Sequence, residues 1–243
     1  MKKVIIAPGG CGKVLTSYDV ASLIEISIRK VYPEVFIKKF MMADGGPGTI
    51  EAIVKAKGGK IFYEQVTGPL GEPVKGKFAI LNDKEVGVVE VTKVSSLPQV
   101  QANKSPMYTT SYGTGELILT AIQQGCKTIY VGIGGAAIND GGTGMLQALG
   151  VRLLNANNEQ IPLGAIGLKQ LKTIDVSNVA TNVKNTKFIC LTDVNDVANE
   201  IVENQLGNAI KKDLNIGASG IAAGLMRVFN MQFVPGAQVI IDF

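Results

Sequence analysis

Two glycine-rich segments of the sequence combine residue types that suit the binding of an anion. One runs from Asp44 to Gly48 and the other from Asp140 to Gly144, and both read Asp-Gly-Gly-x-Gly. Glycine lets backbone N–H groups approach an anion closely, and a helix that starts after such a loop adds unpaired N–H donors and a favourable dipole. A single loop of this kind is a weak motif, but its repetition predicts a ligand with several negatively charged oxygens.

Two more segments have the same character, one at Thr109–Glu116 and the other at Gly217–Gly220. Their hydroxyls could simply form local turns with the backbone, but they also suit a ligand that is rich in oxygen. Four such helix starts therefore predict a polyanionic ligand that is held from several sides. The residues predicted to bind the substrate or its phosphates are Gly45, Gly46, Gly48, Thr110, Ser111, Gly113, Thr114, Gly134, Gly135, Asn139, Asp140 and Gly141.

The candidate catalytic residues are two carboxylates and one lysine. Asp193 follows the apolar run Lys187–Leu191, and ligands of open α/β sheets bind where strands end. Asp44 precedes a glycine pair at a helix start, so helix capping is an equally good explanation of it. Lys13 is a candidate phosphate ligand or a solvated loop residue. A magnesium ion would be bound by Asp193, with Asp140 or Asp44 as the second carboxylate.

The sequence contains no histidine, which restricts the chemistry. Ser-His-Asp and Cys-His nucleophile systems are excluded, as are zinc sites that need imidazole. Carboxylates, lysines, hydroxyls, backbone amides and a hard cation such as Mg²⁺ remain. Phosphoryl transfer fits this set, because it depends mainly on positioning and electrostatic stabilisation.

The composition indicates a globular protein of the cytoplasm. The chain has 243 residues, of which 46% are apolar and 18% charged, and its net charge of +4 is spread along the sequence. This charge is too diffuse to predict nucleic-acid binding, and no apolar run approaches the length of a membrane span. The three cysteines are odd in number and lack metal-ligand spacing, which is typical of free thiols in a reducing compartment.

The first third of the chain alternates between strand-like and helix-like patterns. We expect strands at residues 3–7, 35–40 and 61–66, with helices at 17–31 and 49–56 between them. Short strands separated by helices predict right-handed β-α-β units and a parallel sheet with helices on both faces.

The pattern changes after Val66. Residues 74–81 and 85–91 face each other across a turn and predict an antiparallel hairpin, after which the alternation resumes with a strand at 128–133. The fold class is therefore α/β with two domains, a parallel-sheet domain and an inserted mixed α/β domain. We assign residues 1–66 and 231–243 to the first domain, where residues 238–242 would add a last strand, and residues 67–230 to the second.

Four segments together resemble the bacterial glycerate kinase family of type 1, as a shortened and divergent member. They are Met42–Thr49, Val66–Gly71, Thr109–Leu117 and Gly132–Gly142, and they occur in the family's order and spacing. The resemblance implies a kinase that uses ATP and Mg²⁺ to phosphorylate the small molecule D-glycerate. It also implies that the first domain is Rossmann-like, that the second interrupts it, and that the active site lies between them.

Some positions depart from the family's pattern. The family has an aspartate and a lysine soon after the position of Pro8, where this sequence has Gly9, Gly10 and Cys11, with Lys13 one place later than the family's lysine. The family also continues beyond the position of Phe243. These departures keep a second hypothesis open, a binding or regulatory relative that retains the pocket without the chemistry.

A third hypothesis is a dinucleotide-binding oxidoreductase, prompted by the glycines of Gly132–Gly135. It is less favoured, because no helical sequence begins there and no acidic residue closes the next strand to bind a ribose. Binding of ATP or NAD would separate it from the other two. A homo-oligomer is compatible with the sequence, which does not determine the oligomeric state.

Overall fold

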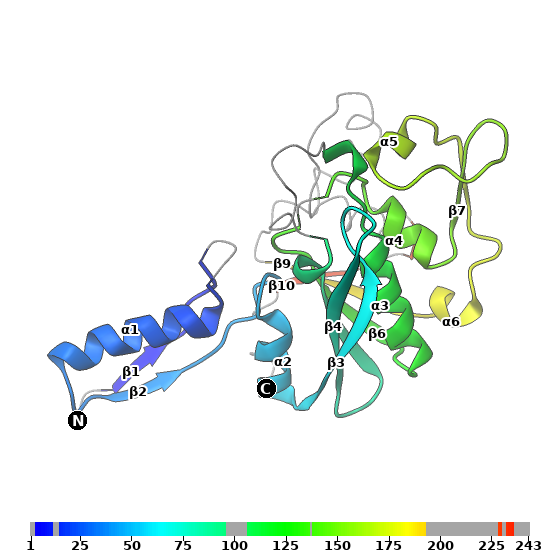
Figure 1. Ribbon diagram of the computed structural model, residues 1–243. Helices are drawn as coiled ribbons and strands as arrows, with labels where there is room; N and C mark the ends of the chain where they lie inside the picture. The colour runs from blue at the N-terminus through cyan, green and yellow to red at the C-terminus, as the bar shows by residue number, and fades with distance from the viewer. Residues whose placement is uncertain are drawn as a thin grey trace.

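A small N-terminal unit consists of one helix packed on a two-stranded parallel sheet (Figure 1). The computed structural model describes residues 3–11, 15–95, 106–136, 138–192, 228–229 and 232–235. In this unit β1 (Lys3–Ile6) pairs with β2 (Phe36–Lys39), and α1 (Ser17–Val31) connects them. Thr16 caps α1, because its hydroxyl accepts from the Asp19 amide while the Asp19 carboxylate accepts from the Thr16 amide.

The small unit exposes an unusual number of large apolar side chains. Ile5 is 70% exposed, Val31 68%, Leu23 55% and Phe36 51%. Parallel sheets are normally covered on both faces, and within the described residues this two-stranded sheet has only α1 against it. The apolar surface of the small unit is thus open in the part of the chain that the structure describes.

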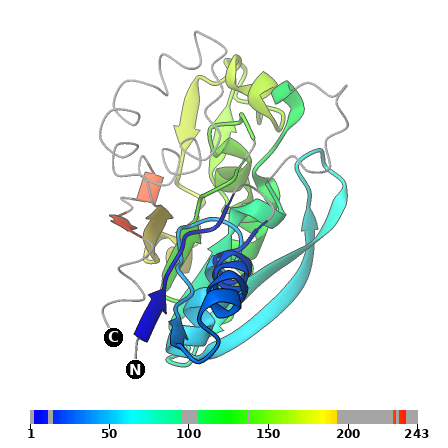
Figure 2. The same ribbon diagram turned by 90° about the vertical axis from the view of Figure 1, so that its left-hand side faces the viewer.

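A six-stranded mixed sheet forms the centre of the larger part, with the strand order β10-β9-β6-β5-β4-β3. Neighbours among β3, β4 and β5 are antiparallel, whereas β5, β6, β9 and β10 run parallel to one another. Figure 2 shows the long β3–β4 hairpin curving along the edge of the molecule. The strands are β3 (Gly59–Thr67), β4 (Pro73–Leu81), β5 (Val86–Glu90), β6 (Thr128–Gly132), β9 (Lys187–Thr192) and β10 (Gln232–Pro235).

Helices cover both faces of this sheet. α2 (Thr49–Lys57) packs Ile50 and Ile53 on a cluster that includes Ala79 and Val88. α3 (Tyr112–Gln123) and α4 (Thr143–Ala148) pack on the neighbouring residues Phe78 and Val89. Because successive residues of a strand point to opposite faces, the two clusters lie on opposite sides of the sheet, which gives a three-layer α/β/α arrangement.

The remaining elements are short and lie outside the main sheet. They are the 3₁₀ helices η1 (Val91–Lys93) and η2 (Pro106–Tyr108), the paired strands β7 (Arg152–Leu154) and β8 (Thr173–Asp175), and the helices α5 (Ala165–Leu168) and α6 (Thr181–Lys184). Among the described helices, none is both long enough and apolar enough to span a bilayer.

The sheet pairings confirm the predicted hairpin but differ from the expected division of the chain. β3 was expected to end the first unit, yet it pairs with β4 over its whole length, from Gly59 opposite Leu81 to Thr67 opposite Pro73. β10 lies within residues 231–243, and it pairs with β9 rather than with β1 or β2. Along the sequence, the boundary between the two-stranded sheet and the six-stranded sheet therefore falls after β2, before α2. The expected strand at 238–242 and the glycine loop at 217–220 lie outside the described residues.

Candidate active site

The Asp44 loop meets the glycine segment Gly132–Gly135 at the edge of the sheet where the parallel strands end. Glu90, Gly132 and Leu191 are cross-strand neighbours at the carboxyl ends of β5, β6 and β9. The Asp44 loop lies on this edge, because the Gly134 amide donates to the Gly45 carbonyl oxygen at 2.9 Å. Binding sites of open α/β sheets are found at this kind of edge, so the tertiary structure brings the Asp44 loop and Gly134 together where a ligand is expected.

Glycine is required at the contact between these loops and β9. Gly45 has φ of +85°, and a β-carbon there would lie 2.2 Å from the Leu191 carbonyl oxygen and 3.4 Å from Thr192 Cα. A β-carbon on Gly134 would lie 2.8 Å from the Gly46 nitrogen. No side chain fits at these distances, so the glycines permit backbone-to-backbone packing of the site.

Asp44 organises its own loop and connects it to the N-terminal unit. Its Oδ1 accepts from the Gly46 amide at 2.9 Å, and its Oδ2 accepts from the Gly10 amide at 3.0 Å. The carboxylate is half-buried. It does not cap α2, whose N-cap residue is Gly48 without a side-chain hydrogen bond. The capping explanation of Asp44 is therefore wrong for this helix, and Asp44 stays a candidate for contact with a ligand.

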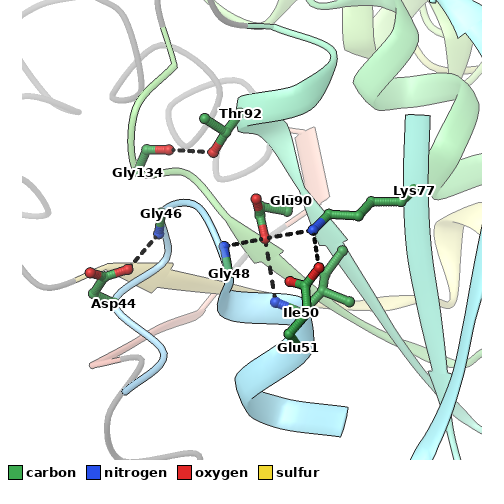
Figure 3. A network of polar contacts seen from close by, with 9 residues as sticks. All are labelled: Asp44, Gly46, Gly48, Ile50, Glu51, Lys77, Glu90, Thr92 and Gly134. Atoms are coloured by element: carbon green, nitrogen blue, oxygen red, sulfur yellow. Dashed lines mark hydrogen bonds and ion pairs between the residues drawn. The ribbon is translucent and has the colours of Figure 1, made fainter. Parts of the chain in front are cut away.

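Glu90 performs the capping that Asp44 does not. Its Oε2 accepts from the amides of Gly48 at 3.2 Å and Ile50 at 3.4 Å, at the first turn of α2 (Figure 3). The side chain is fully buried. Lys77 Nζ lies 3.9 Å from Glu90 Oε2 and 2.5 Å from Glu51 Oε1. Burial raises the pKa of the Glu90 carboxyl group, and the Lys77 ammonium group is the largest opposing influence.

Sequence reasoning missed this network. One signal was present, since Glu90 is a charged residue at the end of the apolar strand Val86–Glu90, in the position that also singled out Asp193. Lys77 gave no comparable signal, because its partner Glu51 is 26 positions away in the sequence.

Asp140 was predicted as a phosphate and magnesium ligand, but its carboxylate is fully enclosed. Oδ2 accepts from the Ser111 amide at 2.7 Å, the Ser111 hydroxyl at 2.8 Å and the Gly144 amide at 3.1 Å, and Oδ1 accepts from the Gly142 amide at 3.0 Å. Burial raises the pKa of Asp140, and these hydrogen bonds act in the opposite direction. The aspartate thus joins the second glycine loop to the start of α3, and it presents no exposed oxygen to a metal ion.

The predicted hydroxyl loop is also part of the scaffold. Thr110, Ser111 and Thr114 are at most 2% exposed, and the Thr114 hydroxyl lies 2.7 Å from that of Ser95. A β-carbon on Gly113 would clash with the Thr67 carbonyl oxygen, at 1.9 Å. These residues pack α3 against β3 and α4, and in the described structure they are covered rather than open to a ligand.

The predicted residues that remain accessible form a smaller set. Gly135 is exposed, while Asp44, Gly48, Gly134 and Asn139 are half-buried; Gly45, Gly46 and Gly141 are buried in the two loops. Lys13 and Asp193 lie outside the described residues. Thr192 precedes Asp193 and lies beside Gly45, which places the end of β9 next to the Asp44 loop.

We expect replacement of Asp140 with asparagine to lower the free energy of unfolding by about 3 kcal/mol, since one oxygen that accepts hydrogen bonds becomes an NH₂ group facing buried donors. Urea denaturation would measure the loss. Asp175→Asn is the matched control, because Asp175 accepts the Ser177 amide on an exposed turn, and its substitution is expected to change stability by less than about 0.5 kcal/mol. Equal stability of the two variants would contradict the scaffold role of Asp140.

Comparison with known proteins gives one consistent result. A model of the "Glycerate kinase family" matches residues 4–198 of this chain. A glycerate kinase of Halalkalibacterium halodurans is 33% identical over 275 residues, covering 100% of this chain and 72% of the relative. A glycerate kinase of Bacillus subtilis is 42% identical over 195 residues, covering 80% of this chain and 51% of the relative.

A solved structure agrees with the sequence relatives. The crystal structure of a candidate glycerate kinase 2 from Salmonella typhimurium LT2 matches with a TM-score of 0.76 and 32% identity, over 99% of this chain and 73% of that one. The chain thus spans between about half and three quarters of the length of the relatives it matches.

Proposed function

This chain belongs to the glycerate kinase family, and from that premise we propose that it transfers a phosphoryl group from ATP to a hydroxyl group of D-glycerate. The observation that carries the proposal is the backbone contact of the Asp44 loop with Gly134, at the carboxyl edge of β6 and β9. Gly45 and Gly134 both belong to segments that resemble the family. Their convergence at a sheet edge is the arrangement expected of a binding site for a nucleotide or a sugar acid.

The residues present fit ATP and Mg²⁺. The accessible part of the site offers backbone amides of glycines such as Gly135, together with the half-buried Asp44 and Asn139. Within the described residues, no group of three or more acidic or cysteine side chains could hold a metal ion. Mg²⁺ needs only one or two carboxylates beside phosphate and water, so we propose Asp44 and Asp193 as its protein ligands.

The chain's own contribution to catalysis would be positioning and electrostatic stabilisation. When bound, ATP and Mg²⁺ supply the phosphoryl group and neutralise its charge. Backbone N–H groups held rigidly by the glycine contacts would stabilise negative charge without rearranging during the reaction. A carboxylate of the same site would orient the glycerate hydroxyl for attack, and the half-buried Asp44 is our candidate for this role.

We also propose that the chain has two domains, divided where the sheets divide. The first would contain β1, α1 and β2, and the second would contain α2 and the six-stranded sheet. The proposed division keeps one domain with a parallel sheet and one with a mixed sheet. Its boundary lies between β2 and α2 instead of at residue 67. The active site would lie where the Gly10 amide of the first unit reaches Asp44.

The test is an assay of ADP release with D-glycerate, ATP and Mg²⁺. We expect turnover that requires all three and stops when EDTA removes the metal. ATP binding without turnover would instead support the inactive relative, which is favoured by Gly9 and Gly12 at the positions where the family has an aspartate and a lysine. Calorimetric binding of NAD but not ATP would favour the oxidoreductase and contradict the kinase.

A further inference from the structure

A buried charged network lies directly beneath the Asp44 loop, and the proposed chemistry does not use it. Glu90 is 0% exposed and the Lys77 side chain 9%, whereas the Glu51 side chain is 42% exposed. The three residues come from β5, β4 and α2. A buried ion pair is often no more stabilising than apolar residues of similar volume, so the need for a stable fold does not by itself explain this network.

The network is connected to the first turn of α2. Gly48 has no side chain with which to cap the helix, and the amides of Gly48 and Ile50 both donate to Glu90 Oε2. Gly48 is two residues after Gly46, whose amide donates to Asp44. The loop that presents Asp44 is therefore fixed at both ends by a carboxylate, at its start by Asp44 itself and at its end by Glu90.

The other oxygen of Glu90 lies on the side of Thr92, whose hydroxyl binds the glycine segment after β6. Oε1 is buried and has no hydrogen-bond partner among the described residues. Figure 3 shows it on the side of the carboxylate that faces away from the amides of Gly48 and Ile50, toward Thr92. The Thr92 hydroxyl donates to the Gly134 carbonyl oxygen at 3.0 Å. The carboxylate thus lies between the first turn of α2 and Thr92, the residue that binds Gly134.

We propose that Glu90 is a positioning residue of the active site, which together with Lys77 holds the Asp44–Gly48 loop in the conformation that binds the phosphoryl donor. This inference rests on the proposed function and assigns one further residue to that site. Glu90 acts through the loop amides and, being fully buried, does not itself contact the substrate. Lys77 balances its charge from the sheet side, while the more exposed Glu51 holds the lysine in place.

The experiment compares wild type with Glu90→Gln, which keeps the shape of the side chain but removes its charge. Hydrogen exchange of the amides of residues 44–50 and the affinity for ATP by calorimetry are measured on the folded protein, together with kcat and KM. We expect the amides to exchange at least about tenfold faster, as for the loss of a hydrogen bond to a charged acceptor. We also expect a rise of about tenfold in the Kd and KM for ATP, with a smaller change in the KM for glycerate.

Asp83→Asn is the matched control. Asp83 precedes β5 at the end opposite Glu90, and its carboxylate also accepts two backbone amides, those of Glu85 at 3.0 Å and Val86 at 3.1 Å. We expect wild-type exchange in residues 44–50 and wild-type kinetics. Lys77→Met tests the network independently of Glu90, and its effect should be smaller in the Glu90→Gln background than alone, since the two residues act as a unit.

The outcomes are separable. Unchanged loop exchange and unchanged ATP affinity in Glu90→Gln would overturn the inference, as would faster exchange spread evenly over the whole chain. If Glu90→Gln does not fold, additive effects of Lys77→Met and Glu90→Asp on ATP affinity would overturn it. A wild type that binds ATP but does not phosphorylate glycerate overturns only the proposed function, and Glu90 is then judged by exchange and affinity. A wild type that binds no ATP overturns both.

Discussion

Replacement of Asp193 with asparagine is expected to abolish turnover of D-glycerate while the protein stays folded. Asp193 follows Thr192, the last residue of β9, and Thr192 lies beside Gly45 in the Asp44 loop. The substitution removes the negative charge of a proposed magnesium ligand but keeps the size of the side chain. A metal ion contributes several kcal/mol to the stabilisation of charge in the transition state, which corresponds to a loss of about a thousandfold in kcat.

The ADP-release assay would measure this loss, and a thermal melt would show whether the fold is intact. Asp175→Asn serves as the control, since Asp175 lies on β8 outside the main sheet and pairs with Arg152 at 3.4 Å. The control is expected to keep wild-type turnover. If Asp193→Asn retained more than about a tenth of the activity, corresponding to about 1.4 kcal/mol, Asp193 could not be an essential ligand of the metal.

Replacement of Gly45 with alanine is expected to impair both stability and activity. Its β-carbon would lie 2.2 Å from the Leu191 carbonyl oxygen, so the loop or β9 must move. The strain of a left-handed backbone and the overpacking together predict a loss of about 3 kcal/mol in the free energy of unfolding. A displacement of the Asp44 loop by about 1 Å would lower turnover by about a hundredfold.

Gly71→Ala separates the two causes. Gly71 has φ of +88°, nearly that of Gly45, but a β-carbon there would have no described atom within 4 Å. In this variant we expect the free energy of unfolding to fall only by the cost of the left-handed backbone, about 1–2 kcal/mol. Turnover should stay at the wild-type level. Urea denaturation and the ADP-release assay would be run on both variants. Equal losses of stability and activity would show that the contact with Leu191 does not position the loop.

The prediction for Glu90 differs in kind from these two. Asp193 and Gly45 are expected to act on the reacting groups or on the shape of the loop, whereas Glu90 would act on the affinity for ATP through two amides at the start of α2. In such an arrangement, some residues contact the ligand and others hold those residues in position. An active site needs both kinds to keep its reacting groups in the productive geometry.

Much of the site could be predicted from the sequence, because its parts are local. The two Asp-Gly-Gly loops, the strand that ends at Gly132 and the hairpin of β4 and β5 depend on glycine, on β-branched residues and on hydrophobic periodicity within short windows. The same windows placed α1 and α2 to within one or two residues. The family itself was also predicted from short segments, and the comparisons with known proteins confirm it.

The roles of the individual carboxylates could not be predicted in the same way. An aspartate before a glycine pair is expected at a helix cap or at a ligand, and the sequence offers the same pattern at Asp44 and Asp140. Their surroundings differ most through residues far along the chain: Gly10 reaches Asp44, while Ser111 encloses Asp140. Whether a carboxylate is open or saturated with donors depends on these distant partners.

Strands, helices and glycine loops follow from the amino-acid sequence alone, since those preferences depend on neighbouring residues. Three features depend instead on long-range contacts: β3 joins the large sheet, Glu90 rather than Asp44 caps α2, and the hydroxyls of Thr110–Thr114 are packed inside. Each of these outcomes depends on strand order and register, which bring together residues 26 to 49 positions apart, as in the pairs Lys77–Glu51 and Thr67–Glu116. Such contacts form when the whole chain buries its apolar surface, and no short window of sequence contains both partners.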